Sequence, residues 1–208
     1  MAIAHVLLDA DGVLQDLPGG WHAAMEPYLG DSTGQFLQET WSDELPMLVG
    51  RGDYMPVLEQ TLVKYGARAS VEEIYREVWC RIDLVPETVA VVHQLRHAGY
   101  GVHLATNQER YRGGYMRTEL GYDELFDISC YSYDIGAMKP DQAFFDEATA
   151  RIGANASELL FIDDTEENVE GARRAGLAAE HWHFSQGHDV LIGHLARHGL
   201  ALGTSTAS

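Results

Sequence analysis

The chain has 208 residues, with 14 lysines and arginines against 32 aspartates and glutamates, so its formal net charge is −18. This balance argues against partners that need clustered Lys and Arg: no nucleic acid and no anionic membrane surface is expected to bind. Hydrophobic residues make up 46% and charged residues 22% of the chain, which is typical of a globular domain and excludes a disordered one.

No apolar run approaches the roughly 20 residues that cross a bilayer. Asp9 and Asp11 interrupt the first apolar run too early for a signal peptide, and no basic segment precedes it. We therefore expect a cytoplasmic protein. Cys80 and Cys130 are far apart in the sequence and are predicted to be reduced thiols.

The first predicted element is a buried strand over residues 3–9, an apolar run that ends in Asp9. A long stretch without any strand pattern follows it. Helices are predicted within that stretch at residues 21–29, 34–41, 54–65 and 71–80. This organisation indicates a small helical module inserted after the first strand.

Beyond the insert, apolar runs and helical stretches alternate. The predicted strands are residues 101–106, 128–132, 159–163 and 178–184, and the predicted helices are residues 86–98, 109–120, 141–152, 166–175 and 188–198. Several helices are followed by a glycine, the usual residue just beyond a helix end. Such alternation predicts a parallel sheet with helices on both faces.

Polar side chains follow the predicted strands at the edge where open α/β sheets bind their ligands. They are Asp9, Asp11 and Gly12 after the first strand, Thr106 and Asn107 after the second, Lys139 after the third, and Asp163, Asp164 and Asn168 after the fourth. Because these strand ends meet at one edge of the sheet, the sequence predicts a single site there.

The residue types of this set fit phosphoryl transfer. Asp9, Asp164 and a backbone carbonyl are oxygen ligands suited to Mg²⁺. Together with Lys139, that ion would neutralise a phosphate dianion so that a carboxylate can attack phosphorus. Asp11 is placed to protonate the leaving oxygen and then to deprotonate a water. Thr106 and the N–H groups after it would hold the phosphoryl oxygens.

In their order along the chain, these motifs resemble those of the haloacid dehalogenase-like (HAD) hydrolase superfamily. The match covers residues 3–14 and 86–184. The segments IGAMKPDQAFF and LLFIDDTEENVEGARRAG are similar to those of subfamily I members, which carry an α-helical (C1) cap after the first motif. The resemblance implies that Asp9 is the nucleophile, Asp11 the general acid and base, and Thr106 and Lys139 the phosphate-binding residues. Asn107, which follows Thr106 at the predicted helix start, is a further candidate for binding phosphate.

The resemblance also implies a Mg²⁺ ion bound by the Asp9 carboxylate, the Asp11 carbonyl and Asp164. Asp163 would either lie behind the ion or join its ligands, so the sequence leaves open which member of the Asp163–Asp164 pair touches the metal. Gly12 and Asn168 would support the loops that carry these groups.

The resulting prediction is an α/β protein with a Rossmann-like core whose strand order is 3-2-1-4-5. Residues 1–15 and 86–200 would form the core, residues 16–85 the helical cap, and residues 201–208 a disordered tail. Trp21, His22 and Arg51 are the cap residues that we consider as substrate contacts. The chain leaves open whether the protein is a monomer or a homodimer.

The predicted function is Mg²⁺-dependent hydrolysis of a small phosphate monoester, such as a sugar phosphate, through an aspartyl-phosphate. A phosphomutase or phosphotransferase of the same superfamily would use the same core residues. A 2-haloacid dehalogenase fits less well, because the true dehalogenases that the chain resembles lack an aspartate at the position of Asp11. A catalytically silent binding protein with this fold is the remaining alternative.

Overall fold

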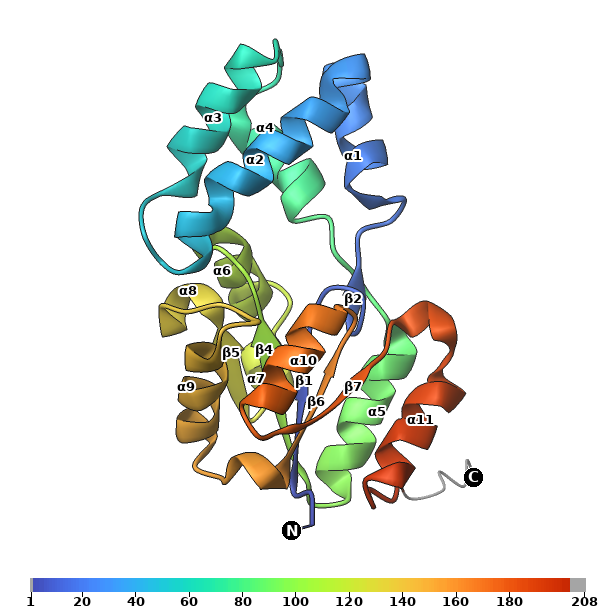
Figure 1. Cartoon of the computed structure of the whole chain (residues 1–208). Helices are drawn as coiled ribbons and strands as arrows, with labels where there is room; N and C mark the ends of the chain where they lie inside the picture. Colours follow the sequence, from blue (N-terminus) through green and yellow to red (C-terminus); the bar gives the residue numbers. More distant parts are fainter. Residues whose placement is uncertain (1, 203–208) are drawn as a thin grey trace.

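The computed structural model describes residues 2–202. Its centre is a parallel five-stranded sheet in the order β5-β4-β1-β6-β7 (Figure 1). The strands are β1 (His5–Leu8), β4 (Gly101–Thr106), β5 (Ile128–Tyr131), β6 (Leu159–Asp163) and β7 (Ala178–His181). Counted along the chain, this is the predicted order 3-2-1-4-5, which is confirmed. The central strand β1 lies between β4 and β6.

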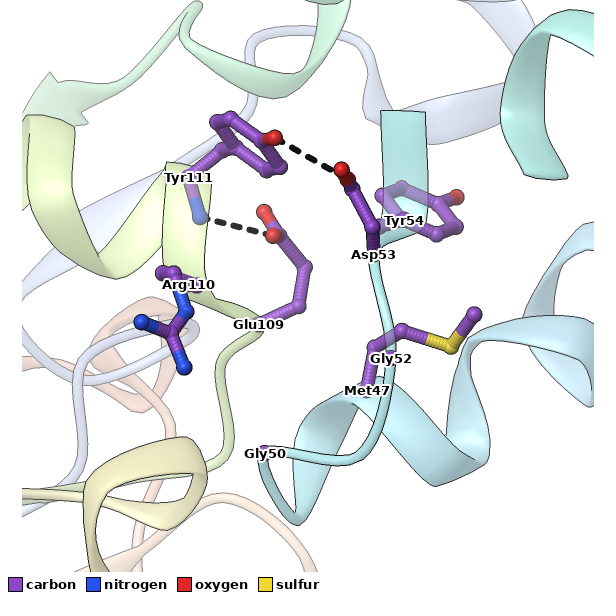
Figure 2. Close-up of a pocket in the computed structure, with 8 residues that line it drawn as sticks. All are labelled: Met47, Gly50, Gly52, Asp53, Tyr54, Glu109, Arg110 and Tyr111. Carbon is purple, nitrogen blue, oxygen red and sulfur yellow. Dashed lines mark hydrogen bonds between the residues drawn. The ribbon is translucent and has the colours of Figure 1, made fainter. Parts of the chain in front are cut away.

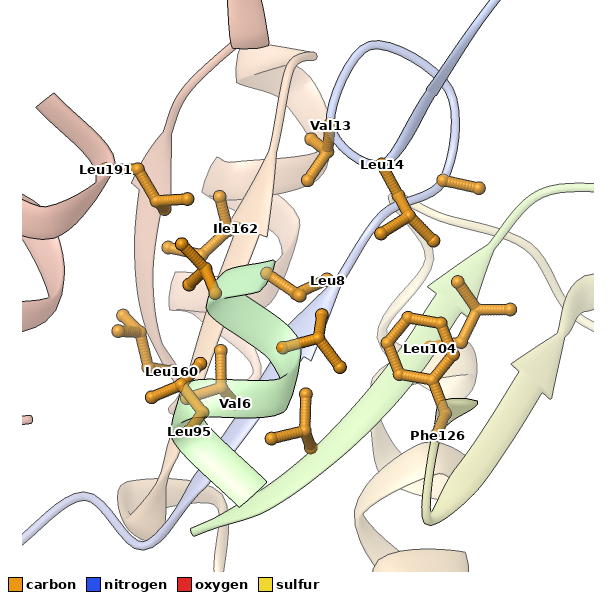
Figure 3. Packing of buried hydrophobic residues seen from close by; sticks show 14 of the residues in the cluster. Val6, Leu8, Val13, Leu14, Leu95, Leu104, Phe126, Leu160, Ile162 and Leu191 are labelled. Atoms are coloured by element: carbon orange, nitrogen blue, oxygen red, sulfur yellow. The ribbon is translucent and has the colours of Figure 1, made fainter. Parts of the chain in front are cut away.

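Helices cover both faces of the sheet because successive strand residues point to opposite sides. Val6 and Leu8 of β1 face a cluster that includes Leu95 of α5 (Pro86–His97) and Leu191 of α11 (His188–Arg197). Figure 3 shows this packing together with Leu104, Leu160 and Ile162 from the neighbouring strands. The buried strands thus carry apolar residues on both faces, as parallel strands usually do.

Leu7 of β1 points to the opposite face. There it joins a second cluster with Phe144 of α9 (Gln142–Ile152) and Val169 of α10 (Glu166–Arg174). The remaining helices of the sheet region are α6 (Arg110–Thr118), α7 (Tyr122–Leu125), α8 (Ser132–Ile135), η3 (Ala156–Glu158) and η4 (Phe184–Gln186).

A helical segment lies over the edge of the sheet at which β1 ends (Figure 1). Its elements are α1 (Gly20–Leu29), η1 (Gly30–Ser32), α2 (Thr33–Leu48), α3 (Tyr54–Lys64), α4 (Val71–Ile74) and η2 (Tyr75–Trp79). These helices bury their own apolar cluster, built around Met25, Phe36, Leu58 and Trp79. We call residues 20–79 the helical segment. The division into a core of residues 1–15 and 86–200 and a cap of residues 16–85 remains our proposal.

Several predicted details differ from the structure. The stretch after β1 contains a strand pair that the sequence does not predict, β2 (Gln15–Asp16) and β3 (Asp83–Leu84), which pair antiparallel. Two residues are too few to leave a recognisable pattern of alternation. Helix α2 does not end at Trp41 but continues through Pro46 to Leu48. The helix predicted at 71–80 is divided into α4 and η2, and β7 ends before residue 184.

Most of the predicted tail, residues 203–208, lies outside the described residues. Within residues 2–202, no helix is both long enough and apolar enough to cross a membrane. Cys80 and Cys130 are free cysteines, as predicted.

The buried His103 gives the sheet a pH-dependent stability. Its side chain lies on β4, is 3% exposed and contacts His5, with His103 Nε2 3.1 Å from His5 Nδ1. Burial, reinforced by the charge of His5 and opposed by Asp127, lowers the pKa of His103 from 6.5 to about 4. Below pH 6.5 the unfolded chain therefore takes up a proton that the folded chain does not.

The stability that this histidine contributes is complete above its unfolded pKa and is lost as the pH falls toward its folded pKa. Between neutral pH and pH 4.5 we expect the loss to amount to about 2 kcal/mol. Urea denaturation at neutral pH and near pH 4.5 measures it, with His103→Leu as the comparison. The variant should lose less stability than the wild type on acidification; an equal loss in both would contradict the assignment.

Candidate active site

The ends of β1, β4 and β6 bring the predicted polar residues together. Asp9 follows β1 directly, and its backbone N–H donates to the carbonyl of Ile162 on β6 at 2.9 Å. Thr106 ends β4 and Asp163 ends β6, and both are buried. Asp9 itself is 7% exposed. The alignment of parallel strands therefore places a carboxylate, a hydroxyl and a second carboxylate at one edge of the sheet.

Lys139 lies between two of these carboxylates. Its Nζ is 2.8 Å from Asp9 Oδ1 and 2.6 Å from Asp163 Oδ2, and the lysine is 1% exposed. Burial acts to lower the pKa of Lys139, but the charges of Asp163 and Asp9 outweigh it and raise the pKa. Burial raises the pKa of Asp9 well above its usual value, although Lys139 opposes this effect. A buried ammonium thus faces the predicted nucleophile.

Asn107 holds the loop that carries Lys139. Its side-chain Nδ2 donates to the Lys139 carbonyl at 2.9 Å, and its Oδ1 accepts from the Lys139 N–H at 2.9 Å. The loop also passes close to Gly171, where an added Cβ would lie 2.5 Å from the carbonyl oxygen of Pro140. The side-chain amide of Asn107 is therefore used to hold the loop that carries Lys139. The phosphate contact predicted for Asn107 would then be made by its backbone N–H.

The acidic pair after β6 has two different environments. Asp163 is fully buried and accepts hydrogen bonds from Lys139, from the Thr165 N–H and from the Asn168 amide, the last at 3.1 and 3.2 Å. Asp164 is only partly buried. Burial and the charge of Asp163 raise the pKa of Asp164.

The described residues offer one cluster of carboxylates that fits a metal ion, namely Asp9, Asp163 and Asp164, whose ligand oxygens lie within 4.8 Å of one another. Hard oxygen donors of this kind suit a small divalent cation. Asp163 is the most fully hydrogen-bonded of the three, but which of them bind the ion directly stays a prediction.

Gly12 is required where the loop after β1 passes Asp164. Its φ of 74° lies in the left-handed region, and an added Cβ would overlap the Asp164 carboxylate. We expect Gly12→Ala to lower the free energy of unfolding by about 3 kcal/mol, because strain and overpacking add. Gly20 is a matched control, with a φ of 78° and no atom within 4 Å of its added Cβ.

Gly20→Ala should lower the free energy of unfolding by only about 1 kcal/mol, because backbone strain at positive φ is the only penalty there. Urea denaturation of the two variants measures the difference. Equal losses would mean that the approach to Asp164 has no energetic consequence.

Asp11 is held by three side chains that the sequence reasoning missed. Arg112 donates from both terminal nitrogens, Nη1 to Asp11 Oδ2 at 2.6 Å and Nη2 to Asp11 Oδ1 at 2.8 Å. Gln15 donates to Oδ1 and Gln108 to Oδ2, each at 2.8 Å. Burial acts to raise the pKa of Asp11, but Arg112 and these hydrogen bonds outweigh it and lower the pKa to about 2.

Thr106 is 1% exposed and lies beside the same network, since Gln108 Nε2 is 3.1 Å from its hydroxyl oxygen. In the sequence, only two features point to Gln108 and Arg112. They follow Thr106 and Asn107 closely, and they are four residues apart, about one helical turn. Nothing in the sequence distinguished Arg112 from its exposed neighbour Arg110.

A small pocket of about 140 Å³ lies where the helical segment meets the first turn of α6 (Figure 2). It is lined by Met47, Gly50, Gly52, Asp53, Tyr54, Glu109, Arg110 and Tyr111. The Tyr111 hydroxyl donates to Asp53 Oδ1 at 2.9 Å across the junction. Nearby, burial and the charge of Glu109 raise the pKa of Glu44, on α2, to about 8. The junction thus presents several carboxyl groups.

The three cap residues considered as substrate contacts lie in different places. The Trp21 ring packs edge-on against Trp79, with centroids 5.5 Å apart, and lies 5.5 Å from the Arg112 guanidinium carbon. His22 and Arg51 are exposed. Contact of any of these three with a substrate stays a prediction.

Comparison with known proteins agrees with this architecture. The haloacid dehalogenase-like hydrolase family matches residues 3–176, and the chain belongs to that family. A phosphoglycolate phosphatase from Yersinia pestis is 25% identical over 191 residues, covering 84% of this chain and 78% of the relative. The relatives named as phosphatases place the chain among hydrolases of the phosphatase type.

Solved structures show the same fold. A predicted HAD-like family hydrolase from Porphyromonas gingivalis superposes with a TM-score of 0.77 at 20% identity, covering 95% of this chain and 99% of that one. A HAD family enzyme from Bacteroides thetaiotaomicron, solved with magnesium and inorganic phosphate, has a TM-score of 0.71 at 19% identity, covering 86% and 94%.

Proposed function

We propose that this protein is a Mg²⁺-dependent phosphatase that hydrolyses a small phosphate monoester through an aspartyl-phosphate on Asp9. The observation that carries the proposal is the position of Lys139, whose Nζ lies 2.8 Å from Asp9 Oδ1 at the carboxyl edge of the sheet. A buried ammonium beside a carboxylate lets that carboxylate approach a phosphate dianion, which it would otherwise repel.

The Asp9 carboxylate, the Asp11 carbonyl and the Asp164 carboxylate are the groups that we assign to the metal. Bound there, Mg²⁺ would supply positive charge to the phosphoryl oxygens and orient them. The oxygen cluster of Asp9, Asp163 and Asp164 supports this assignment, as does the magnesium held by the Bacteroides thetaiotaomicron neighbour.

The reaction then needs two proton transfers. First, an Asp9 oxygen bonds to phosphorus while the bond to the leaving oxygen breaks, and that oxygen takes a proton from Asp11. Asp11 has to leave the Arg112 fork to carry this proton, because the fork holds its carboxyl ionised. Next, the oxygen of a water bonds to phosphorus while the bond to Asp9 breaks, and the proton of that water passes to Asp11. The net change converts ester and water to alcohol and phosphate, with Asp9 and Asp11 restored.

The helical segment supports a small substrate, because it covers the edge of the sheet that holds the site. The relatives act, by their names, on small molecules such as phosphoglycolate and glyceraldehyde 3-phosphate. We propose a phosphorylated metabolite of similar size as the substrate. The free thiols of Cys80 and Cys130 support a cytoplasmic location, which remains part of this proposal.

Phosphate release from a panel of phosphorylated metabolites tests the function, with Mg²⁺ present and after its removal by a chelator. We expect release from at least one metabolite, loss of activity on chelation, and recovery when Mg²⁺ is added back. Formation of an isomeric phosphate without phosphate release would instead identify a mutase. No turnover of any metabolite or of acetyl phosphate would contradict the proposal.

A further inference from the structure

Helix α2 carries a buried stripe that leads to a carboxyl group. The buried residues of the helix are Thr33, Phe36, Leu37 and Thr40, and their spacing of three or four positions puts them on one face. Glu44 continues this spacing, one turn after Thr40, and is half-buried. The helix contacts α8 of the sheet region (Figure 1). Glu44 therefore lies on the inner face of the helical segment, where this segment meets the sheet region.

The Glu44 carboxyl has no partner among residues 2–202, since no group there donates a hydrogen bond to it and it forms no ion pair. Burial raises the pKa of Glu44 to about 8, with Glu109 and Asp11 adding to the effect and Arg112 opposing it. The charge of Glu44 acts on Arg112 in return. Because interactions between charges weaken with distance, these effects place the carboxyl beside the candidate active site.

The hydroxyl of Tyr54 is a second polar group without a partner at this junction. Tyr54 begins α3 and is 1% exposed, and its hydroxyl is buried without a hydrogen bond to any of residues 2–202. After burial, the charge of Glu44 is the next cause that raises the pKa of Tyr54, so the carboxyl and the hydroxyl lie near each other. Buried polar groups normally have partners, so this pair points to a ligand that forms hydrogen bonds.

Aromatic rings lie next to this pair. The Trp79 ring centroid is 6.1 Å from that of Tyr54 and 5.5 Å from that of Trp21, and Trp21 is only partly buried. The Trp21 ring also lies 5.5 Å from the guanidinium carbon of Arg112, which holds Asp11. An aromatic face suits C–H groups, whereas a carboxyl and a hydroxyl bind O–H groups. Polyols and sugars carry both kinds of group.

The charges at the junction disfavour a second anion. Arg112 is the basic side chain that acts on Glu44, and it is already bonded to both Asp11 oxygens and to the Trp79 carbonyl. Glu109 is 1% exposed and adds a further carboxyl group. An anionic group beside Glu44 would therefore meet other carboxyl groups. Phosphoglycolate, for which the Yersinia pestis relative is named, carries such a group and fits this place poorly.

We propose that Glu44 and Tyr54 bind the leaving group, and that the substrate is a phosphate monoester of a polyol or sugar without a second anionic group. This inference rests on the proposed phosphatase function and names its substrate class. Hydroxyl groups of the leaving alcohol form hydrogen bonds with the Glu44 carboxyl and the Tyr54 hydroxyl, while its C–H groups contact Trp21. Glu44 can bind a hydroxyl in either protonation state, because a carboxylate accepts and a carboxylic acid also donates.

Three substrates with the same three-carbon chain test the proposal. Glycerol 1-phosphate has two free hydroxyl groups, propyl phosphate has none, and 3-phosphoglycerate has a carboxylate in place of the terminal hydroxymethyl group. We expect kcat/KM of the wild type to be at least about tenfold higher for glycerol 1-phosphate than for propyl phosphate, because propyl phosphate leaves both polar groups unpaired. 3-Phosphoglycerate should also be hydrolysed less efficiently than glycerol 1-phosphate.

Glu44→Leu removes the hydrogen bonds and keeps a side chain of similar size. It should lower kcat/KM for glycerol 1-phosphate about tenfold through a raised KM, and change the value for propyl phosphate by no more than about twofold. Glu44→Gln should retain most of the preference, because an amide still binds hydroxyl groups, and Tyr54→Phe should lose part of it.

Glu59→Leu is the matched control, since Glu59 is exposed on α3, and it should leave the ratio of the kcat/KM values unchanged. Retained turnover of propyl phosphate shows that each variant is folded.

The possible failures are distinguishable. If the wild type releases phosphate from none of these esters and from no metabolite of the panel, the proposed function is wrong. If the wild type is active but shows no preference for glycerol 1-phosphate over the other two substrates, the substrate class is wrong. If Glu44→Leu lowers kcat/KM for glycerol 1-phosphate and propyl phosphate equally, or lowers neither, Glu44 does not bind the leaving group.

Discussion

Asp9→Asn is expected to abolish phosphate release, with a fall of about 10⁵-fold in kcat, the scale seen when a nucleophile is removed. An amide cannot form the acyl-phosphate, and the neighbouring carboxylates have other partners or roles, since Asp164 is assigned to the metal. Asp163 is buried and bonded to Lys139 and Asn168, and Asp11 is held by Arg112. The nucleophilic role therefore depends on a single side chain.

Two measurements check this expectation. Phosphate release gives the rate, and trapping of a phosphorylated protein with hydroxylamine shows whether an acyl-phosphate forms. Asp146→Asn is the control, since Asp146 is an exposed aspartate on α9 and should retain wild-type activity. Turnover at the wild-type rate by Asp9→Asn would reject Asp9 as the nucleophile.

Lys139→Met should destabilise the fold more than any of the other variants. Removal of the ammonium leaves the carboxylates of Asp9 and Asp163 facing each other, in a place where Asp163 is 0% exposed. Removing one partner of a buried ion pair typically costs about 3–5 kcal/mol. We expect a loss of that size in the free energy of unfolding, together with loss of phosphate release.

The chain provides a matched control, because its only other lysine is exposed. Lys64 Nζ lies 2.6 Å from Glu39 Oε1, but its side chain is 60% exposed. Lys64→Met should change the free energy of unfolding by about 1 kcal/mol or less. Urea denaturation of both variants gives the comparison, and similar losses in the two would contradict the argument from burial.

The sheet could be predicted well because its signals are local. Each buried strand is an apolar run, and glycines such as Gly99 and Gly176 follow the helices. The end of α2 was not predicted, because the helix continues past Trp41 and even includes Pro46, a residue that normally ends a helix. A proline removes one hydrogen bond, and packing against other helices can compensate for that loss.

The site was predictable to the extent that its residues follow strands. Asp9, Thr106 and Asp163 lie at strand ends, and the sheet brings them together whatever the loops do. The surroundings of Asp11 were not predictable in this way. Arg112 lies on α6, whose sequence is rich in polar residues and predicts an exposed helix. Only the tertiary fold shows that the helical segment covers Arg112.

The insertion of the helical segment after β1 also bears on how the chain folds. β1 pairs with β4 on one side and with β6 on the other, and both partners come from beyond the insertion. Contacts so distant in sequence form slowly, because a long loop must close first. Within the helical segment, successive helices contact one another, as α1 contacts α2 and α2 contacts α3, so we expect it to form sooner than the sheet. Asp9, attached to β1, is then among the last groups to reach its final position.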